Sequence, residues 1–118
     1  MIRLRDLMRR NVEWAEPRDL LRDAARKMES ANLALLPVCE NRRLVGVLRQ
    51  EDVEMFRRRN ESRMASTPVR ALMRTDVICG NESQDMREVV RLMREKEIRI
   101  LPVLDGVRRL VGIYSFGI

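Results

Sequence analysis

Apolar residues recur along the chain with the spacing of amphipathic helices, and two short apolar runs follow each helical stretch. The helical spacing i, i+3, i+4, i+7 occurs at two places. It is carried by Leu21, Ala24, Ala25 and Met28 in the first half and by Met86, Val89, Val90 and Met93 in the second. The apolar runs occupy 33–38 and 44–48, then 98–103 and 110–114. The pattern predicts one helix and two strands in each half.

Polar residues mark the ends of these elements. Asp19 and Ser83 precede the two helices and are expected to cap them, because short polar side chains accept hydrogen bonds from free N–H groups in a first helical turn. Asn41 and Gly106 are expected in the turns between the paired strands. The nearly continuous apolar character of the strands predicts that both of their faces are covered.

Three further segments complete the prediction. Short extended segments are expected around Val12 and Val77, ahead of the two amphipathic helices. Residues 50–63 are expected to be helical, with Val53 and Phe56 on one face, and residues 65–68 break that helix at a proline.

The two halves are copies of one sequence unit. The residues that recur 65 positions later are Leu7, Met8, Arg9, Val12, Arg22, Arg26, Met28 and the run Leu36-Pro37-Val38. After one inserted residue, the run Arg42-Arg43-Leu44-Val45-Gly46 recurs 66 positions later. We divide the chain into repeat 1 (1–64), a linker (65–68) and repeat 2 (69–118). A unit of about 50 residues buries little surface alone, so the copies are expected to pack together.

Composition and charge narrow the classes of function. The chain has 118 residues, 45% of them hydrophobic and 36% charged, as expected of a globular protein. The formal net charge is +6, and 22 of the 24 basic residues are arginines. Guanidinium groups suit carboxylates and phosphates, so an anionic ligand or partner is compatible with this composition. Aromatic residues for base stacking make up only 3%, which argues against a nucleic-acid-binding protein.

Residue types that many enzymes need are missing. The chain has no histidine, which excludes an imidazole base, a Ser-His or Cys-His pair and a histidine metal ligand. Cys39 and Cys79 fit neither a zinc motif nor a disulfide framework, so reduced thiols in a cytoplasmic protein are expected. No signal peptide and no apolar run of membrane-spanning length is visible. We expect neither catalysis, a metal site nor a membrane association.

The order of these elements resembles the CBS domain, named after cystathionine beta-synthase. The resemblance is carried by Leu-Met, an extended Val, an amphipathic helix, a Leu-Pro-Val strand and an Arg-Leu-Val-Gly strand, each present twice. Two such domains in tandem resemble a Bateman module, which implies an α/β (α+β) fold and a homodimer. The family implies a regulatory module without an obligatory cofactor that binds AMP, ADP, ATP or S-adenosylmethionine between its repeats and signals to an effector protein.

The family's ligand motif is Gly-x-x-Ser/Thr-x-x-Asp, and each copy here keeps half of it. From Gly46, the first copy has Asp52 in place but Arg49 instead of the hydroxyl residue. The second copy keeps Ser115 but ends at Ile118, where the acid is expected. An ionised carboxylate accepts hydrogen bonds from both ribose hydroxyls, and such charge-assisted bonds are strong. The final helix of the second repeat is expected to be absent, because the sequence stops at Ile118.

The resemblance implies two composite clefts. The first is expected to use the ribose ligand Asp52 with Val47, a base pocket, and phosphate contacts from arginines. The base pocket is expected from Val77, Ile78, Cys79, Ile100 and Pro102. The phosphate contacts are expected from Arg99 and Arg49. The second, weaker cleft is expected to use Ser115, Ile113, Val12, Trp14, Leu35 and Pro37. It lacks the acid, and Ala34 stands where the other copy has Arg99.

Simpler interpretations remain open for these residues. Asp52 falls in the first turn of a predicted helix, where a carboxylate stabilises the positive end of the helix dipole. Arg99 could form a surface ion pair instead of a phosphate contact. Trp14 is expected in a core or interface rather than in base stacking. The whole chain could also be a ligand-free dimerisation scaffold.

Overall fold

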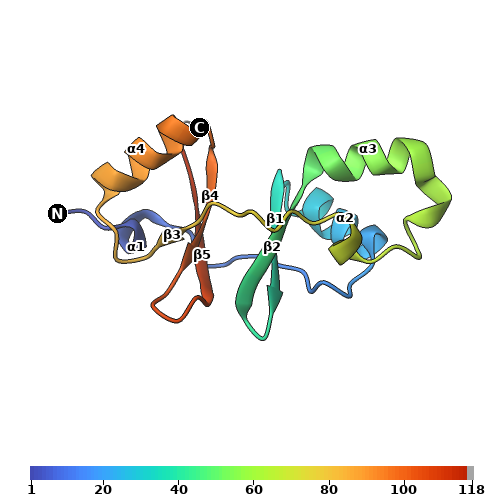
Figure 1. The fold of residues 1–118 in the computed structure, drawn as a ribbon, viewed down its shortest axis with the longest axis horizontal. Helices are drawn as coiled ribbons and strands as arrows, with labels where there is room; N and C mark the ends of the chain where they lie inside the picture. Colours follow the sequence, from blue (N-terminus) through green and yellow to red (C-terminus); the bar gives the residue numbers. More distant parts are fainter. Residues whose placement is uncertain (117–118) are drawn as a thin grey trace. The chain divides into compact units, whose positions relative to one another are not determined.

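The computed structural model describes residues 1–116, which form two compact units (Figure 1). Unit 2 is one continuous segment, Glu13–Val77. Unit 1 combines Met1–Val12 with the chain from Ile78 onward. The compact units are therefore divided differently from the sequence repeats, because the first dozen residues of repeat 1 pack with the helix and strands of repeat 2.

Unit 2 is built on a two-stranded antiparallel sheet covered by helices. Its elements are α2 (Leu21–Ser30), β1 (Leu35–Glu40), β2 (Arg43–Arg49), α3 (Gln50–Asn60), and the short 3-10 helices η1 (Glu61–Arg63) and η2 (Val69–Ala71). Leu35 lies opposite Arg49 in the sheet, and the register shifts at Val38/Cys39. Ala15 forms a parallel bridge to Val38, so the extended pairing begins a few residues after the predicted position at Val12.

Unit 1 repeats this plan with a three-stranded sheet. Its elements are α1 (Leu4–Leu7), β3 (Gly80–Asn81), α4 (Met86–Lys96), β4 (Ile100–Leu104) and β5 (Leu110–Ser115). β3 runs parallel to β4, and β4 runs antiparallel to β5. The predicted α/β class and the order helix, strand, strand in each repeat are confirmed.

Each unit has its own apolar core. In unit 2 the core side chains come from both helices, the sheet and the segment after η1: Leu21, Ala25, Met28, Leu36, Val38, Leu48, Val53, Met64 and Val69. In unit 1 they come from α1 and the residue after it, from α4 and from β4: Leu4, Met8, Met86, Val89, Met93, Leu101 and Val103. The helical face predicted from the i, i+3, i+4, i+7 spacing is the face that each helix buries.

The repeated Leu-Met-Arg segments explain the repeated glycines. A Cβ atom on Gly46 would lie 2.8 Å from the Arg74 carbonyl oxygen and 3.0 Å from the Met73 Sδ. A Cβ atom on Gly112 would lie 2.8 Å from the Arg9 carbonyl oxygen. Each strand therefore needs a glycine, because a Leu-Met-Arg segment from the other sequence repeat passes directly against it.

Two capping predictions are wrong. The N-cap of α2 is Leu20, and the Asp19 carboxylate instead accepts a hydrogen bond of 2.8 Å from the Glu16 backbone N–H. The N-cap of α4 is Asp85 rather than Ser83, and its carboxylate accepts from the Arg87 N–H at 2.9 Å. Both predicted residues lie in the turns that precede the helices. The prediction therefore located each turn correctly but placed the first helical residue too early.

Of the two places expected for Trp14, a core or an interface, the structure excludes the core. Its side chain is 39% exposed, and its carbonyl accepts a hydrogen bond of 2.8 Å from Lys27 Nζ. Among the described residues, no helix is long and apolar enough to cross a membrane. The same part of the chain contains no cluster of three side chains able to hold a metal ion.

Candidate functional site

Asp52 lies in the first turn of α3, directly after β2. The helix begins at Gln50 with Arg49 as its N-cap, and Arg49 makes no side-chain capping bond. The Asp52 side chain is only 18% exposed. Its two oxygens accept hydrogen bonds from Arg74 Nε at 3.1 Å and Arg74 Nη2 at 3.2 Å. The fold thus presents a mostly buried carboxylate whose orientation is set by a bidentate guanidinium.

Arg74 is in turn held by the strand that leads into α3. Its backbone N–H donates to the Val47 carbonyl at 2.8 Å, and the Val47 N–H donates to the Arg74 carbonyl at 2.9 Å. Val47 is buried and lies beside Gly46, where the Leu-Met-Arg segment approaches most closely. Val47, Asp52 and Arg74 therefore form one connected cluster within unit 2. The ion pair raises the pKa of Arg74, chiefly through its hydrogen bond to Asp52.

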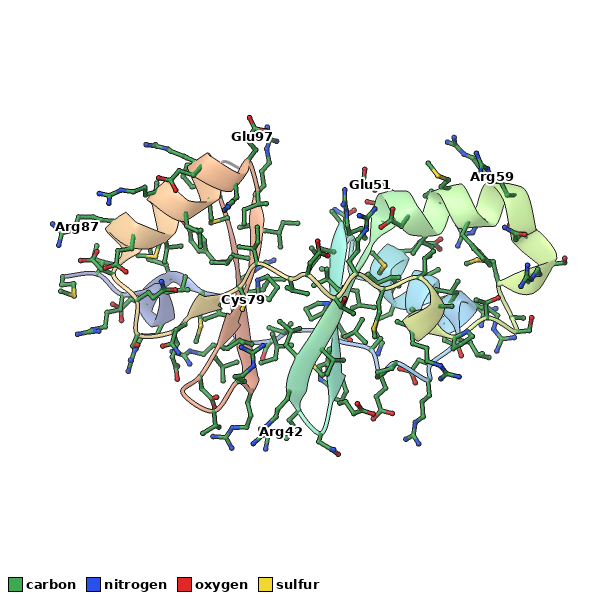
Figure 2. All side chains as sticks on the ribbon, viewed as in Figure 1. Arg42, Glu51, Arg59, Cys79, Arg87 and Glu97 are labelled. Atoms are coloured by element: carbon green, nitrogen blue, oxygen red, sulfur yellow. The ribbon has the colours of Figure 1, made fainter. Side chains whose placement is uncertain are left out.

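Arg49 belongs to the same end of β2 but has a different partner. Its guanidinium pairs with Glu51 in the first turn of α3, and its side chain is 40% exposed. Figure 2 labels Glu51 at the start of that helix. The two arginines next to the acid thus differ, since Arg74 is bonded to Asp52 and Arg49 to the neighbouring Glu51.

The remaining residues predicted for the first cleft are divided between the units. Val77 ends unit 2, whereas Ile78 and Cys79 begin the second segment of unit 1. All three are partly buried. Cys79, labelled in Figure 2, immediately precedes β3.

Arg99 directly precedes β4, Ile100 begins it, and Pro102 lies within it. Ile100 is partly buried and Pro102 is fully buried. Arg99 is exposed and makes no ion pair with any residue in 1–116, so the interpretation of Arg99 as a surface ion-pair residue is not supported.

The two strand pairs place residues from the two predicted clefts side by side. Ile100 pairs with Ser115, and Pro102 pairs with Ile113. In unit 2, Leu35 pairs with Arg49, and Pro37 pairs with Val47 in the same way. Each unit therefore carries part of the residue set predicted for each cleft.

The second set of residues repeats the backbone arrangement without the acid. Ile113 exchanges two backbone hydrogen bonds with Arg9, at 2.8 and 2.9 Å, as Val47 does with Arg74. Ser115 ends β5, and Val12 ends the first segment of unit 1. The last motif positions, Gly117 and Ile118, lie outside the described residues. Within 1–116, Arg9 has no carboxylate partner.

Sequence reasoning missed the role of Arg74. In the sequence this arginine stands out only as the last residue of a repeated Leu-Met-Arg segment. No function was assigned to its side chain. The signal that points to it is the repeat itself, since Arg9 and Arg74 occupy equivalent positions next to the strand that carries the ligand motif. A basic residue conserved between two copies beside a motif acid is a candidate partner for that acid.

The CBS-domain family model matches residues 4–58 and 69–117. The CBS domain-containing protein YhcV of Bacillus subtilis is 32% identical over 117 residues, which cover 99% of this chain and 82% of that protein. A putative acetoin utilization protein (AcuB) of Vibrio cholerae has a similar structure, with a TM-score of 0.88, 28% identity, and coverage of 98% of this chain and 84% of that one.

CBSX2, solved in complex with AMP, superposes with a TM-score of 0.83 and 26% identity, covering 99% of this chain and 92% of that one. The resemblance drawn from the repeated motifs is therefore confirmed by a family match to both repeats. The chain belongs to the CBS-domain family and carries two CBS domains in tandem.

Proposed function

We propose that this chain is a non-catalytic regulatory module that binds an adenosine nucleotide, AMP, ADP, ATP or S-adenosylmethionine, through residues of both repeats. The observation that carries the proposal is the oriented, mostly buried carboxylate of Asp52, fixed by Arg74 at the start of α3. A ribose diol would donate hydrogen bonds to the outer lone pairs of this carboxylate. The complex of the related CBSX2 with AMP supports the ligand class.

The arginines supply the charge that such a ligand needs. Arg99 is exposed and has no ion-pair partner in residues 1–116, so its guanidinium is available for a phosphate. Arg49 is half exposed and would exchange Glu51 for a more highly charged phosphate group. We assign the adenine to the partly buried Val77, Ile78, Cys79 and Ile100, whose apolar surfaces suit a flat heterocycle. Pro102 is fully buried and would support this pocket without lining it.

Signalling would follow from differential binding. A ligand shifts a conformational equilibrium only by the difference in its affinity for the two states. The residues assigned to the ligand come from both sequence repeats, so a ligand that contacts all of them would favour one conformation of the chain over others. A homodimer mate or a separate effector protein in the cytoplasm would detect that conformation.

Thermal unfolding with each nucleotide tests the proposal. A ligand at 100 times its dissociation constant stabilises a protein by about 2.7 kcal/mol, which is a shift of several degrees for a chain of this size. Asp52→Asn should abolish the shift and leave the fold intact. Asp23→Asn, which removes an exposed acid whose ion-pair partner within residues 1–116 is Arg22, is the matched control and should keep the full shift. Flat curves for all four nucleotides at millimolar concentration would contradict the proposal.

A ligand-free dimerisation scaffold is the second candidate. It is favoured by the fact that Asp52 already has a full bidentate partner, which is what a purely structural acid requires. Under this alternative, no nucleotide binds at any concentration, and Asp52→Asn lowers stability without changing any ligand response. Sedimentation of the wild-type chain would then show a dimer that is insensitive to added nucleotide.

A further inference from the structure

The start of α3 carries more acidic than basic side chains. Asp52 holds Arg74 through two hydrogen bonds, and Glu51 pairs with Arg49, the last residue of β2. Asp76 is a third acid close to them, because its charge also raises the pKa of Arg74. We call these five residues of unit 2 the α3 charge cluster. With three carboxylates and two guanidinium groups, the cluster has a formal charge of −1.

The two acids at the start of the helix differ in exposure and in how firmly their partners are held. The Asp52 side chain is 18% exposed, whereas that of Glu51 is 64% exposed. Asp52 has a bidentate partner whose backbone is bonded to β2, and Glu51 has the half-exposed Arg49. Exposed ion pairs contribute little to stability, so the pair of Arg49 and Glu51 is the one that a ligand can open.

Opening this pair frees Arg49 for a ligand but does not remove Glu51. Arg49 occupies the motif position three residues before Asp52, and in the proposed site it contacts phosphate. Glu51 lies in the first turn of α3, two positions after Arg49, so its carboxylate remains beside any phosphate that takes its place. Repulsion between like charges is proportional to the product of the charges, so it grows with every negative charge that the ligand adds.

We propose that Glu51 is a specificity-determining residue of the nucleotide site and disfavours ligands with more than one phosphate group. The inference rests on the proposed function, since it concerns the tail of a ligand whose ribose is held by Asp52. AMP would bring one phosphate group, which Arg49 compensates. The further phosphate groups of ATP would be repelled by Glu51 and by a cluster that is already negative. S-adenosylmethionine carries a sulfonium and an ammonium group, so Glu51 would attract its tail.

Isothermal titration calorimetry of the wild type and of Glu51→Gln tests the inference. The ligands are S-adenosylmethionine, adenosine, AMP and ATP, in a buffer without magnesium so that ATP keeps its full charge. Glutamine keeps the size of the side chain and removes its charge. Glu51→Gln should bind ATP about tenfold and AMP about threefold more tightly, leave adenosine unchanged, and bind S-adenosylmethionine about threefold more weakly.

A purely structural role for Glu51 predicts a different result. The substitution would then change the affinity for all four ligands by the same factor. Under the proposal, the gain for ATP should also shrink as salt is added, because salt screens exposed charges. Glu51 is exposed, so the melting temperature of Glu51→Gln without ligand should stay close to that of the wild type.

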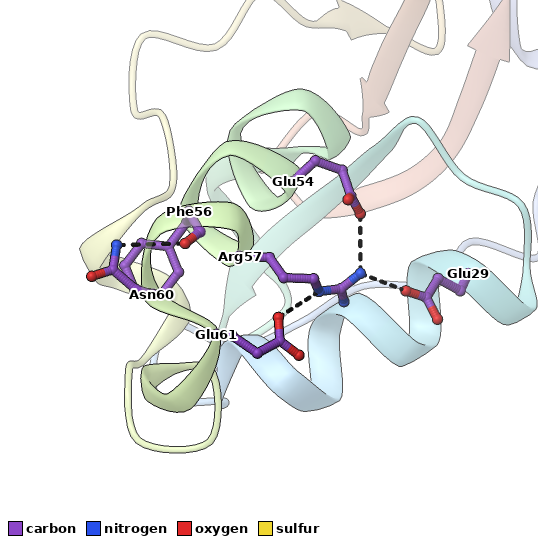
Figure 3. A network of polar contacts seen from close by, with 6 residues as sticks. All are labelled: Glu29, Glu54, Phe56, Arg57, Asn60 and Glu61. Atoms are coloured by element: carbon purple, nitrogen blue, oxygen red, sulfur yellow. Dashed lines mark hydrogen bonds and ion pairs between the residues drawn. The ribbon is translucent and has the colours of Figure 1, made fainter.

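Glu29→Gln is the matched control. The Glu29 side chain is 61% exposed and pairs with Arg57 at 3.1 Å. This pair belongs to a separate network, in which Arg57 also contacts Glu54 and Glu61 (Figure 3). The control makes the same change of charge outside the α3 charge cluster. The ratio of its affinities for ATP and AMP should therefore remain that of the wild type.

The possible failures separate this inference from the proposed function. One common factor for all four ligands, an unchanged affinity of Glu51→Gln for ATP, or an equal gain for ATP in Glu29→Gln would overturn the role of Glu51 and leave the nucleotide site in place. If the wild type binds none of the four ligands, the proposed function itself is wrong, and the role of Glu51 is rejected with it.

Discussion

Asp52 and Arg74 are joined by two parallel hydrogen bonds, although 22 positions separate them in the sequence. The pair connects the first turn of α3 to the Leu-Met-Arg segment that follows η2. The Arg74 backbone is also bonded to Val47, so the guanidinium has an anchored base, and the acid cannot turn away without losing both of its hydrogen bonds. A ligand would therefore meet a carboxylate in a single, prepared orientation.

The first prediction concerns Arg74 as a positioning residue for Asp52. Arg74→Ala should weaken AMP binding about tenfold, because the carboxylate loses its fixed orientation before the ligand arrives. Isothermal titration calorimetry measures the change. Arg9→Ala is the matched control, since Arg9 makes the same backbone contacts to Ile113 without a carboxylate partner in residues 1–116. Tighter binding by Arg74→Ala would show instead that Arg74 competes with the ligand.

The second prediction concerns the glycines in the two Arg-Leu-Val-Gly strands. Gly46→Ala should destabilise the chain by roughly 1–3 kcal/mol, because the new Cβ cannot fit against the backbone of the neighbouring segment. Gly106→Ala has no heavy atom within 4 Å of its added Cβ and should be nearly neutral. Urea unfolding measures both variants. Equal midpoints for the two would mean that the Leu-Met-Arg segment moves aside at no cost.

The third prediction concerns acid sensitivity at the start of α4. Hydrogen bonds from Arg87 lower the pKa of Asp85 from 3.8 to about 2. A carboxyl group with a lowered pKa in the folded state stabilises the fold above the unfolded pKa and loses this contribution as the pH falls toward the folded value. Asp85→Asn should therefore be less stable than wild type at pH 7, and the difference should disappear between pH 4 and 2.

Thermal unfolding across this pH range provides the measurement for Asp85. Asp23→Asn is a suitable control, because Asp23 is an exposed acid in the first turn of α2 and does not cap that helix. A stability difference for Asp85→Asn that persists unchanged at pH 2 would contradict the assigned role of the carboxylate.

The fourth prediction concerns the two thiols. Burial raises the pKa of Cys39 to about 11, so this thiol stays protonated and shielded near neutral pH. Cys79 is partly exposed. At pH 8 a disulfide reagent should modify one thiol per native chain and both after unfolding. Cys79→Ser should remove the native reaction, whereas Cys39→Ser should preserve it. If the proposed site is correct, AMP should also slow the reaction of Cys79.

The sequence was sufficient for the order of the elements and for most of the core. Helical spacing identified the faces of α2 and α4 that are buried, because burial on one face is what produces that spacing. The same spacing cannot locate the first residue of a helix, because that position depends on a local hydrogen bond from a capping side chain. Asp85 rather than Ser83 is the N-cap of α4, because its carboxylate accepts a hydrogen bond from the Arg87 N–H.

The acid of the candidate site could be predicted, but its partner could not. Asp52 has a fixed place in a motif, six residues after Gly46 in one continuous stretch. Arg74 reaches it only because the chain returns to β2 after α3 and η2, and such long-range contacts leave no local pattern. Trp14 lies outside both apolar cores, and its expected place in an interface stays a prediction.

The discontinuity of unit 1 has a consequence for how the chain acquires its structure during translation. Unit 2 is contiguous, so all of its contacts are available once residue 77 has left the ribosome. Leu4 and Met8 leave the ribosome before unit 2, yet their partners around α4 and β5 are made after it. The amino-terminal segment must therefore remain unpaired while an entire folding unit is synthesised and collapses between its two ends. The high sequence separation of these contacts should make closure of unit 1 the slow kinetic phase.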